Sequence, residues 1–180
     1  MCLNRKRMRN IIRILLLVTV LFSFLFFSLA KDVKAQNSYE LFWPIVAGRT
    51  SEDPLYFLKL LKEKVRGVLI FSDVKKAEYY LFLSEKRLVE FENLVAEKKD
   101  IENAKKTLAM LRDNHSKVVS SFMKATVGGG EIEYINQRIQ NSFGNQSLIL
   151  EGLLSVVEGD LKNSVSETLS FLKSEAGQLR

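Results

Sequence analysis

Residues 53–65 read DPLYFLKLLKEKV, and residues 71–78 read FSDVKKAE. Asp53 is a residue type that caps helix N-termini and Pro54 suits a first helical turn, so a helix is predicted to begin here. Apolar residues of this helix gather on one side, which is broad: Leu55, Leu58, Leu61, Val65, Val68 and Leu69, widened by Phe57, Leu60 and Ile70. A face this broad predicts that other helices cover this one on more than one side.

A tight turn is predicted next, because Ser72 and Asp73 supply the N-cap of a second helix. In that helix apolar positions recur in alternating steps of three and four: Val74, Ala77, Leu81, Ser84, Leu88, Phe91 and Val95. A second series has the same spacing: Ile101, Ala104, Leu108, Leu111, His115, Val118 and Phe122. This spacing is typical of helices packed lengthwise. Residues 97–100 form a short polar joint, so the two segments predict a long antiparallel helical hairpin.

The C-terminal third predicts two more helices. Gly128, Gly129 and Gly130 break the helical pattern, and residues 131–140 predict a short amphipathic helix. Residues 141–145 resemble a turn, and residues 146–173 predict a last helix in which Gly159 is an unfavourable residue. No strand-like alternation appears, so the sequence predicts an all-α bundle over residues 53–178.

Residues 1–35 have the three parts of a secretory signal peptide. A basic segment at residues 5–9 precedes 16 uncharged residues at 14–29. Small residues then offer cleavage sites after Ala30 and after Ala35.

The alternative for this leader is an uncleaved membrane anchor, which would contact the bilayer through residues 11–30. Both alternatives predict that the rest of the chain lies outside the cytoplasm. Residues 36–52 form an aromatic-containing linker. Its Phe42 and Trp43 are expected to pack on the bundle, or, beside a retained anchor, to lie at the level of the lipid headgroups.

The formal charge of +6 belongs to the leader. Residues 1–35 hold seven of the 27 Lys and Arg and one of the 21 acids, which leaves 20 of each in residues 36–180. A nucleic-acid-binding domain concentrates positive charge on one face, so nucleic acid is not a predicted partner. The one cysteine, Cys2, precedes the apolar run. The exported body therefore has no internal disulfide and no thiolate for catalysis or metal binding.

The sequence predicts no catalytic, cofactor-binding or metal-binding residue. His115, the only histidine, occupies an inward heptad position without the further His, Cys or Glu-x-x-His partners of a zinc or di-iron site, so a core or boundary histidine is predicted. Gly128–Gly130 predict a hinge and not a phosphate loop, because no Lys-Ser/Thr follows.

An acidic row is predicted on the first long helix. Glu78, Glu85 and Glu92 recur every seven residues, so their backbones lie roughly 10 Å apart. This separation is too large for sharing a proton or a small cation. A solvated flank is predicted, supported by pairs such as Lys86–Glu90.

Residues 53–63 and 72–78 resemble a bacterial extracytoplasmic family of unknown function. Its members typically read D-S-P-L-Y-x-L-K-x-L-K-E and then F-D-P-x-K-K-A-E, followed by a segment similar to LFLSEKRL at residues 81–88. The resemblance covers about residues 50–112, with Glu52 where Ser is common and Val74 where Pro is common. It implies an exported, helix-rich envelope domain, and it brings no catalytic residues.

These observations predict a non-enzymatic cell-envelope protein, secreted or tethered to the outer face of the cytoplasmic membrane. We expect it to work through helix-mediated contacts with a protein partner or with itself. Candidate contact residues are Tyr56, Phe57, Tyr79 and Phe82, although core packing is an alternative for each. An alternative function is a ligand- or cation-binding stress sensor. A cell-wall hydrolase would need a converging carboxylate pair, which the sequence does not show.

Overall fold

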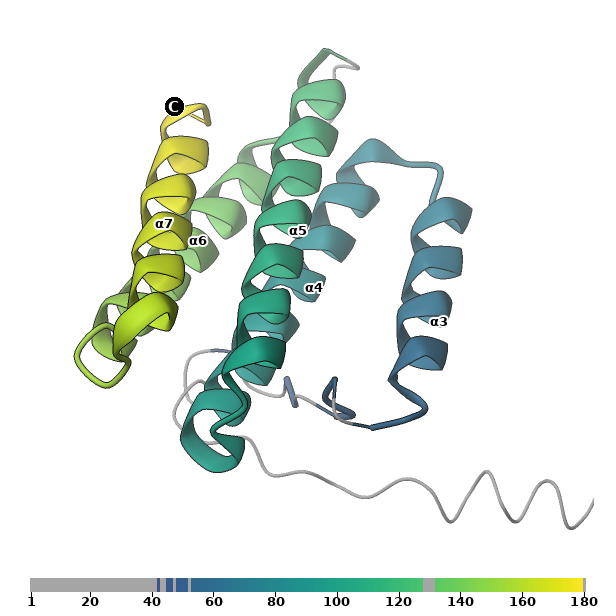
Figure 1. The fold of residues 1–180 in the computed structure, drawn as a ribbon. Helices are drawn as coiled ribbons and strands as arrows, with labels where there is room; N and C mark the ends of the chain where they lie inside the picture. The colour runs from purple at the N-terminus through teal and green to yellow at the C-terminus, as the bar shows by residue number, and fades with distance from the viewer. Residues whose placement is uncertain (1–41, 43–44, 47, 52, 128–131, 180) are drawn as a thin grey trace, which may run out of the picture. The chain divides into compact units, whose positions relative to one another are not determined.

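The computed structural model describes residue 42 and residues 45–46, 48–51, 53–127 and 132–179. The chain divides into two units, residues 1–32 and 33–180, and every described residue belongs to the second unit. The described residues form five α-helices and one π-helical segment, without a strand (Figure 1). The prediction of an all-α bundle is confirmed.

Several predicted features lie outside the described residues. These are the leader with its segment 11–30, the cleavage sites Ala30 and Ala35, Trp43, and the break at Gly128–Gly130. Of the helices that are described, none combines the length and the apolar character needed to cross a bilayer.

The predicted hairpin is confirmed. It consists of α4 (Asp73–Asn93) with the π-helical segment Leu94–Lys98, followed by α5 (Ile101–Val127). Lys99 adopts a left-handed conformation with φ of 53° and ends the first arm. The Asp100 carboxylate then accepts a hydrogen bond of 3.0 Å from the Asn103 amide and begins the second arm. The polar joint therefore reverses the chain where the sequence predicted.

The boundary between the last two helices differs from the prediction. A single helix, α6 (Glu133–Leu153), runs through residues 141–145, and the break falls at 154–158, before α7 (Gly159–Gly177). The expected turn at 141–145 is wrong because Ser142 and Phe143 are buried and continue the inward face of α6. Tertiary packing overrides the weak helix propensity of this stretch. Gly159 instead begins α7 with φ of +56°.

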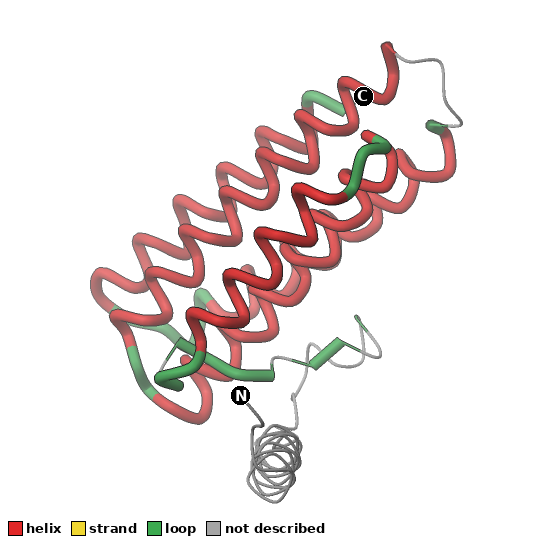
Figure 2. The backbone as a smooth tube through the Cα atoms, turned by 90° about the vertical axis from the view of Figure 1, so that its right-hand side faces the viewer, coloured by secondary structure: helices red, strands yellow, loops and turns green. Residues whose placement is uncertain are grey.

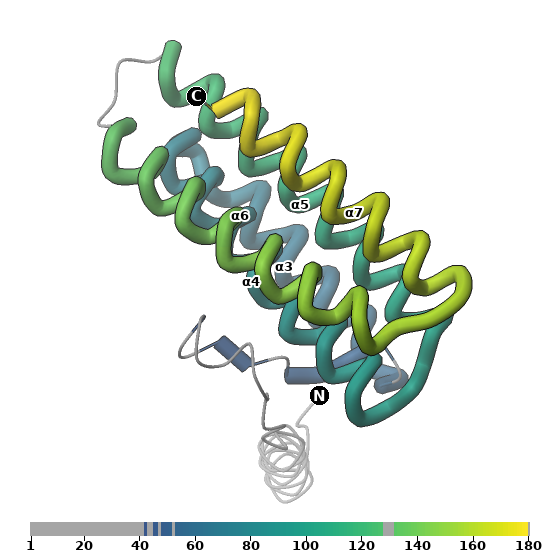
Figure 3. The backbone as a smooth tube through the Cα atoms, turned by 90° about the vertical axis from the view of Figure 1, so that its left-hand side faces the viewer, coloured from purple at the N-terminus to yellow at the C-terminus, as the bar shows by residue number. Residues whose placement is uncertain are grey.

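Four of the helices make a bundle. Each packs on two neighbours, in the ring α4–α5–α7–α6, and all four lie lengthwise (Figures 2 and 3). The ring encloses two apolar clusters. One is centred on Phe91, Leu108 and Leu150, and the other on Leu81, Val118 and Phe143. Phe42 packs into the first cluster, which confirms its expected place on the bundle.

The fifth helix, α3 (Tyr56–Leu69), lies outside this ring and packs mainly on α4 (Figure 1). It begins two residues later than predicted, with Leu55 and not Asp53 at the N-cap position. In the preceding turn the Asp53 carboxylate accepts a hydrogen bond of 2.8 Å from the Leu55 amide. Ser72 is the N-cap of α4, and its hydroxyl accepts a hydrogen bond from the Lys75 amide, as predicted. The connection from α3 to α4 is therefore short.

Candidate functional site

The apolar face of α3 points away from the bundle. Six large side chains on it are between 43% and 71% exposed: Phe57, Leu58, Leu61, Val65, Val68 and Leu69. At about 100° per residue they fall within an arc of roughly 120° along the helix. We call these six residues the apolar stripe. The expectation that other helices cover this face is wrong.

The stripe is large for a soluble monomer. With roughly 100 Å² exposed on each of six side chains, the stripe presents about 600 Å² of apolar surface. This area lies at the upper end of the size range for the largest apolar patch on a typical monomer. Phe71, in the turn directly after α3, is 87% exposed and extends the apolar surface beyond the helix. Patches of this size mark interaction sites.

The opposite face of α3 explains this orientation, because it carries charges that bind α4. Arg87 of α4 is buried, and its guanidinium donates to both carboxylate oxygens of Glu90 at 2.7 Å and to the Glu63 carboxylate of α3. Lys86 donates to the same Glu63 at 3.0 Å, and Lys59 of α3 donates to Glu90. The two carboxylates and three cations form one cluster between the helices, and we call it the ionic cluster.

Two tyrosines complete the contact between α3 and α4. The Tyr56 hydroxyl donates to Glu90 at 3.0 Å, and the Tyr79 hydroxyl donates to the backbone carbonyl of Glu63 at 3.0 Å. Burial, together with the Glu90 carboxylate, raises the pKa of Tyr56. Burial also lowers the pKa of Lys59 to about 8, although Glu90 favours its charged form.

Gly67 of α3 is buried against the side chains of α4. A Cβ at this position would lie 3.1 Å from the Tyr80 hydroxyl oxygen and 3.5 Å from the ring of Tyr79. Glycine is therefore favoured where the charged face meets α4. A glycine on the charged face of a helix is the signal that could have identified the buried side from the sequence.

The four predicted contact residues divide into two pairs. Tyr56 and Tyr79 are buried at 7% exposure, so the expectation of an exposed contact is wrong for them. Phe57 and Phe82 are exposed, at 60% and 38%. Contact of these two rings with a partner stays a prediction. The remaining members of the apolar stripe were not among the predicted contacts, because the sequence assigned them to the core.

This geometry lies within a region that matches a known family. The model of a family described as "Domain of unknown function (DUF5667)" matches residues 48–157, which is more than half of the chain. The chain belongs to this family. The DUF5667 region contains α3, the ionic cluster, the α4–α5 hairpin and α6, and it ends before α7. It also includes the residues that resemble an extracytoplasmic family of unknown function, although that signature and a bacterial origin stay predictions.

No further similarity identifies the chain. No curated protein matches it, and no solved structure matches it.

The acidic row of the DUF5667 region is not a solvated flank. Glu85 and Glu92 are buried at 7% exposure, and only Glu78 is partly exposed. The Ser142 hydroxyl donates to Glu85 at 2.6 Å, and burial raises the pKa of this carboxyl group. The predicted Lys86–Glu90 pair is also wrong, because α3 supplies Glu63 and Lys59 as their partners. Sequence reasoning had no information on which helix covers α4.

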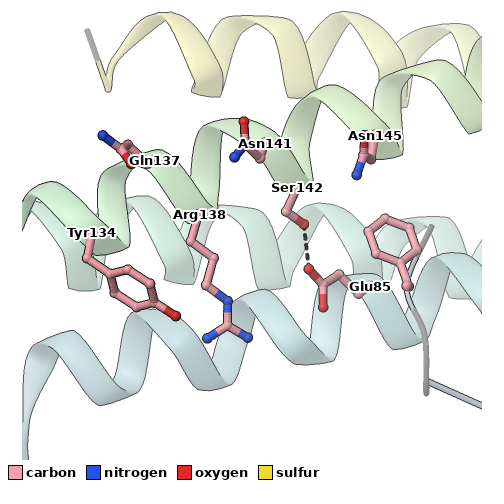
Figure 4. A pocket seen from close by; sticks show the side chains of 8 residues that line it. Glu85, Tyr134, Gln137, Arg138, Asn141, Ser142 and Asn145 are labelled. Atoms are coloured by element: carbon pink, nitrogen blue, oxygen red, sulfur yellow. Dashed lines mark hydrogen bonds between the residues drawn. The ribbon is translucent and has the colours of Figure 1, made fainter.

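Glu85 lies in a polar cleft of about 340 Å³ between α4 and α6. Figure 4 shows Glu85 pointing from α4 toward Ser142, with the amide side chains Gln137, Asn141 and Asn145 following one another along α6. Arg138 lies on the same side and pairs with Glu78 at 3.4 Å. The cleft offers both donors and acceptors without an excess of either charge.

His115 is fully buried, as predicted for a core position. Its Nε2 lies 2.7 Å from Gln146 Oε1, and the Gln146 amide in turn donates to Ser84 and to Ser142, both at 3.0 Å. Burial lowers the pKa of His115 to about 4, so the ring is neutral and Nε2–H donates. Ser84, His115 and Gln146 form a polar layer between the two apolar clusters of the core.

The described residues include no group of three or more His, Cys, Asp or Glu that could hold a metal ion. The absence of catalytic, cofactor-binding and metal-binding residues in the whole chain stays a prediction.

Proposed function

We propose that the chain is an exported, non-enzymatic envelope protein whose DUF5667 region binds a protein partner through the apolar stripe of α3. The observation that carries this proposal is the inverted orientation of α3, with Lys59 and Glu63 paired to α4 and the apolar side chains exposed. Buried ion pairs of this kind contribute more to fixing the orientation of a helix than to the net stability of the fold. The fold therefore holds an apolar helix face outward.

The register of the stripe fits a helix as the partner. Leu58, Leu61, Val65 and Val68 follow steps of three and four, the spacing at which one helix packs lengthwise on another. The amphipathic partner helix would lie along α3, whose 14 residues span roughly 21 Å. Helix-in-groove and coiled-coil recognition use such apolar anchors.

Charge at the edges of the stripe favours a different protein over a second copy. Lys62 and Lys64 lie on opposite edges of the stripe, and both are exposed. In a pair of α3 helices these lysines would face lysines, which is unfavourable at the flanking positions of a coiled coil. We propose a partner helix with Glu or Asp at its edges.

Location outside the cytoplasm is part of the same proposal and rests on the sequence. The basic segment, the uncharged run and the small residues at Ala30 and Ala35 support export. A retained anchor would hold the DUF5667 region close to the membrane.

Two designed peptides test the proposal. Both carry leucine and isoleucine in heptad positions, one with glutamate and the other with lysine at the flanking positions. We expect the full chain to bind the glutamate peptide, to bind the lysine peptide at least tenfold more weakly, and to lose binding on Leu61→Asp. The matched control is Leu148→Asp, because Leu148 is 63% exposed on α6, against 53% for Leu61 on α3.

A photoreactive residue at position 61, compared with one at position 148, extends the test to the native envelope. A discrete crosslinked protein at position 61 alone supports the proposal. Crosslinking to lipid, dimers of the chain itself, or the same products at both positions would overturn it.

A further inference from the structure

A basic groove runs between α3 and α4, on the side of α3 next to the apolar stripe. It consists of two hollows of about 410 and 470 Å³ that share Arg66, Tyr79 and Phe82. Five of the ten residues lining the first hollow are cationic and one is acidic: Arg49, Lys59, Lys62, Arg66 and Lys86 against Glu63. The second adds Lys75 and Arg138 against Glu78. The body of the protein is formally neutral, so this concentration of positive charge is local.

The acidic residues of the groove already have cationic partners. Glu63 binds Lys86 and the buried Arg87, and Glu78 pairs with Arg138 at 3.4 Å. Arg49 and Lys59 are likewise paired, with Asp53 and Glu90, so none of these carboxylates neutralises Lys62, Arg66 or Lys75. The charge that faces solvent in the groove is positive.

Three cations are available to a ligand. Lys62, Arg66 and Lys75 are exposed, and no carboxylate of the described residues lies within ion-pair distance of them. Arg66 is held over the ring of Tyr79, with its guanidinium carbon 5.3 Å from the ring centroid. This contact positions the guanidinium before a ligand arrives.

The chemistry of these groups selects the ligand. A guanidinium presents a planar set of donors that matches the oxygens of a phosphate, and ammonium groups add charge-assisted hydrogen bonds. The ring of Phe82, which is 38% exposed, lines both hollows and offers apolar contact to an organic group attached to the phosphate. A phosphate has more acceptor oxygens than a carboxylate, so it can accept more hydrogen bonds from Arg66 and a neighbouring lysine of either hollow.

We infer that the groove between α3 and α4 binds a phosphate group, carried on a phosphodiester such as a lipid headgroup or on a soluble polyphosphate. Lys62 borders both this groove and the proposed partner surface, but Arg66 and Lys75 lie outside the apolar stripe, so the two proposals can fail separately. A protein that failed to bind either peptide could still bind phosphate, and the reverse also holds.

Calorimetric titration of the full chain at physiological ionic strength tests the inference with two probes. Tripolyphosphate supplies the phosphate chemistry alone, and dihexanoyl phosphatidylglycerol, below its micelle concentration, supplies a soluble lipid headgroup. The variant Arg66→Gln/Lys75→Gln is expected to lose at least tenfold in affinity for any probe that binds, because charge-assisted hydrogen bonds are removed. Binding of tripolyphosphate identifies the phosphate itself as the ligand, and binding of the lipid alone identifies the headgroup.

The matched control is Lys106→Gln/Lys162→Gln, which removes the same charge from exposed positions on α5 and α7. We expect this control to change affinity less than twofold, since long-range charge is screened at this ionic strength. An equal loss in both variants would show unspecific attraction and overturn the inference. Failure of both probes to bind the unaltered chain, with its helical content intact by circular dichroism, would also overturn it.

Discussion

Acid should destabilise this protein through His115, its only histidine. The ordinary pKa of the ring is 6.5, and burial lowers it to about 4 in the folded chain. Between these values the unfolded chain binds a proton that the folded chain does not bind. Stability therefore falls as the pH falls from 6.5 toward 4.

The size of the effect follows from the two pKa values. At pH 5 the unfolded histidine is mostly protonated and the folded histidine mostly neutral, so the free energy of unfolding should be lower than at pH 7 by about 2 kcal/mol. Near pH 4 the loss approaches about 3 kcal/mol. Glu85 acts in the opposite direction, because burial raises its pKa and its protonation favours the folded state.

A variant without the titrating ring separates these contributions. The free energy of unfolding is measured at pH 7 and at pH 5 by urea unfolding followed by circular dichroism. Its decrease between the two pH values should be larger for the unaltered chain than for His115→Gln, by about 2 kcal/mol. NMR of the single imidazole gives the pKa directly. A ring that titrates near 6.5 in the folded protein, or equal losses in both proteins, would refute the reasoning.

The remaining predictions concern stability and share one assay, the urea midpoint at pH 7. Arg87→Met should destabilise the fold by about 3–5 kcal/mol, because it removes the buried guanidinium that donates three hydrogen bonds to the Glu63 and Glu90 carboxylates. Its control Lys106→Met, in an exposed pair with Glu102, should change stability by less than about 1 kcal/mol. An Arg87 variant as stable as this control would contradict the buried cluster. Gly159→Ala should cost about 1–2 kcal/mol because φ is +56° at this position. Gly144→Ala, in open space within α6, should instead stabilise by about 0.5–1 kcal/mol; a loss there would support the turn that the sequence predicted at 141–145.

Heptad spacing in the sequence was sufficient to predict the α4–α5 hairpin and the inward position of His115. The boundary between α6 and α7 was misplaced, because Gly144 and its polar neighbours resemble a turn when packing is ignored. In the structure, Phe143 fills one apolar cluster of the core and holds the helix continuous across that stretch. The free energy lost to weak helix propensity in this stretch is smaller than the free energy gained by burying one aromatic side chain.

What the sequence by itself determined is the set of elements: an apolar helix after Pro54, a long hairpin and further amphipathic helices. Periodicity carries this information because it depends only on the geometry of a single helix. What only the tertiary structure decided is the direction that α3 faces. An amphipathic helix has two sides, and the sequence predicted that the apolar side of α3 would be buried. Glu63 and Lys59 instead pair with Arg87, Lys86 and Glu90 on α4, residues 23 to 31 positions away in the chain. Because that pairing joins two helices, no pattern within α3 could reveal it, and it leaves the apolar stripe exposed.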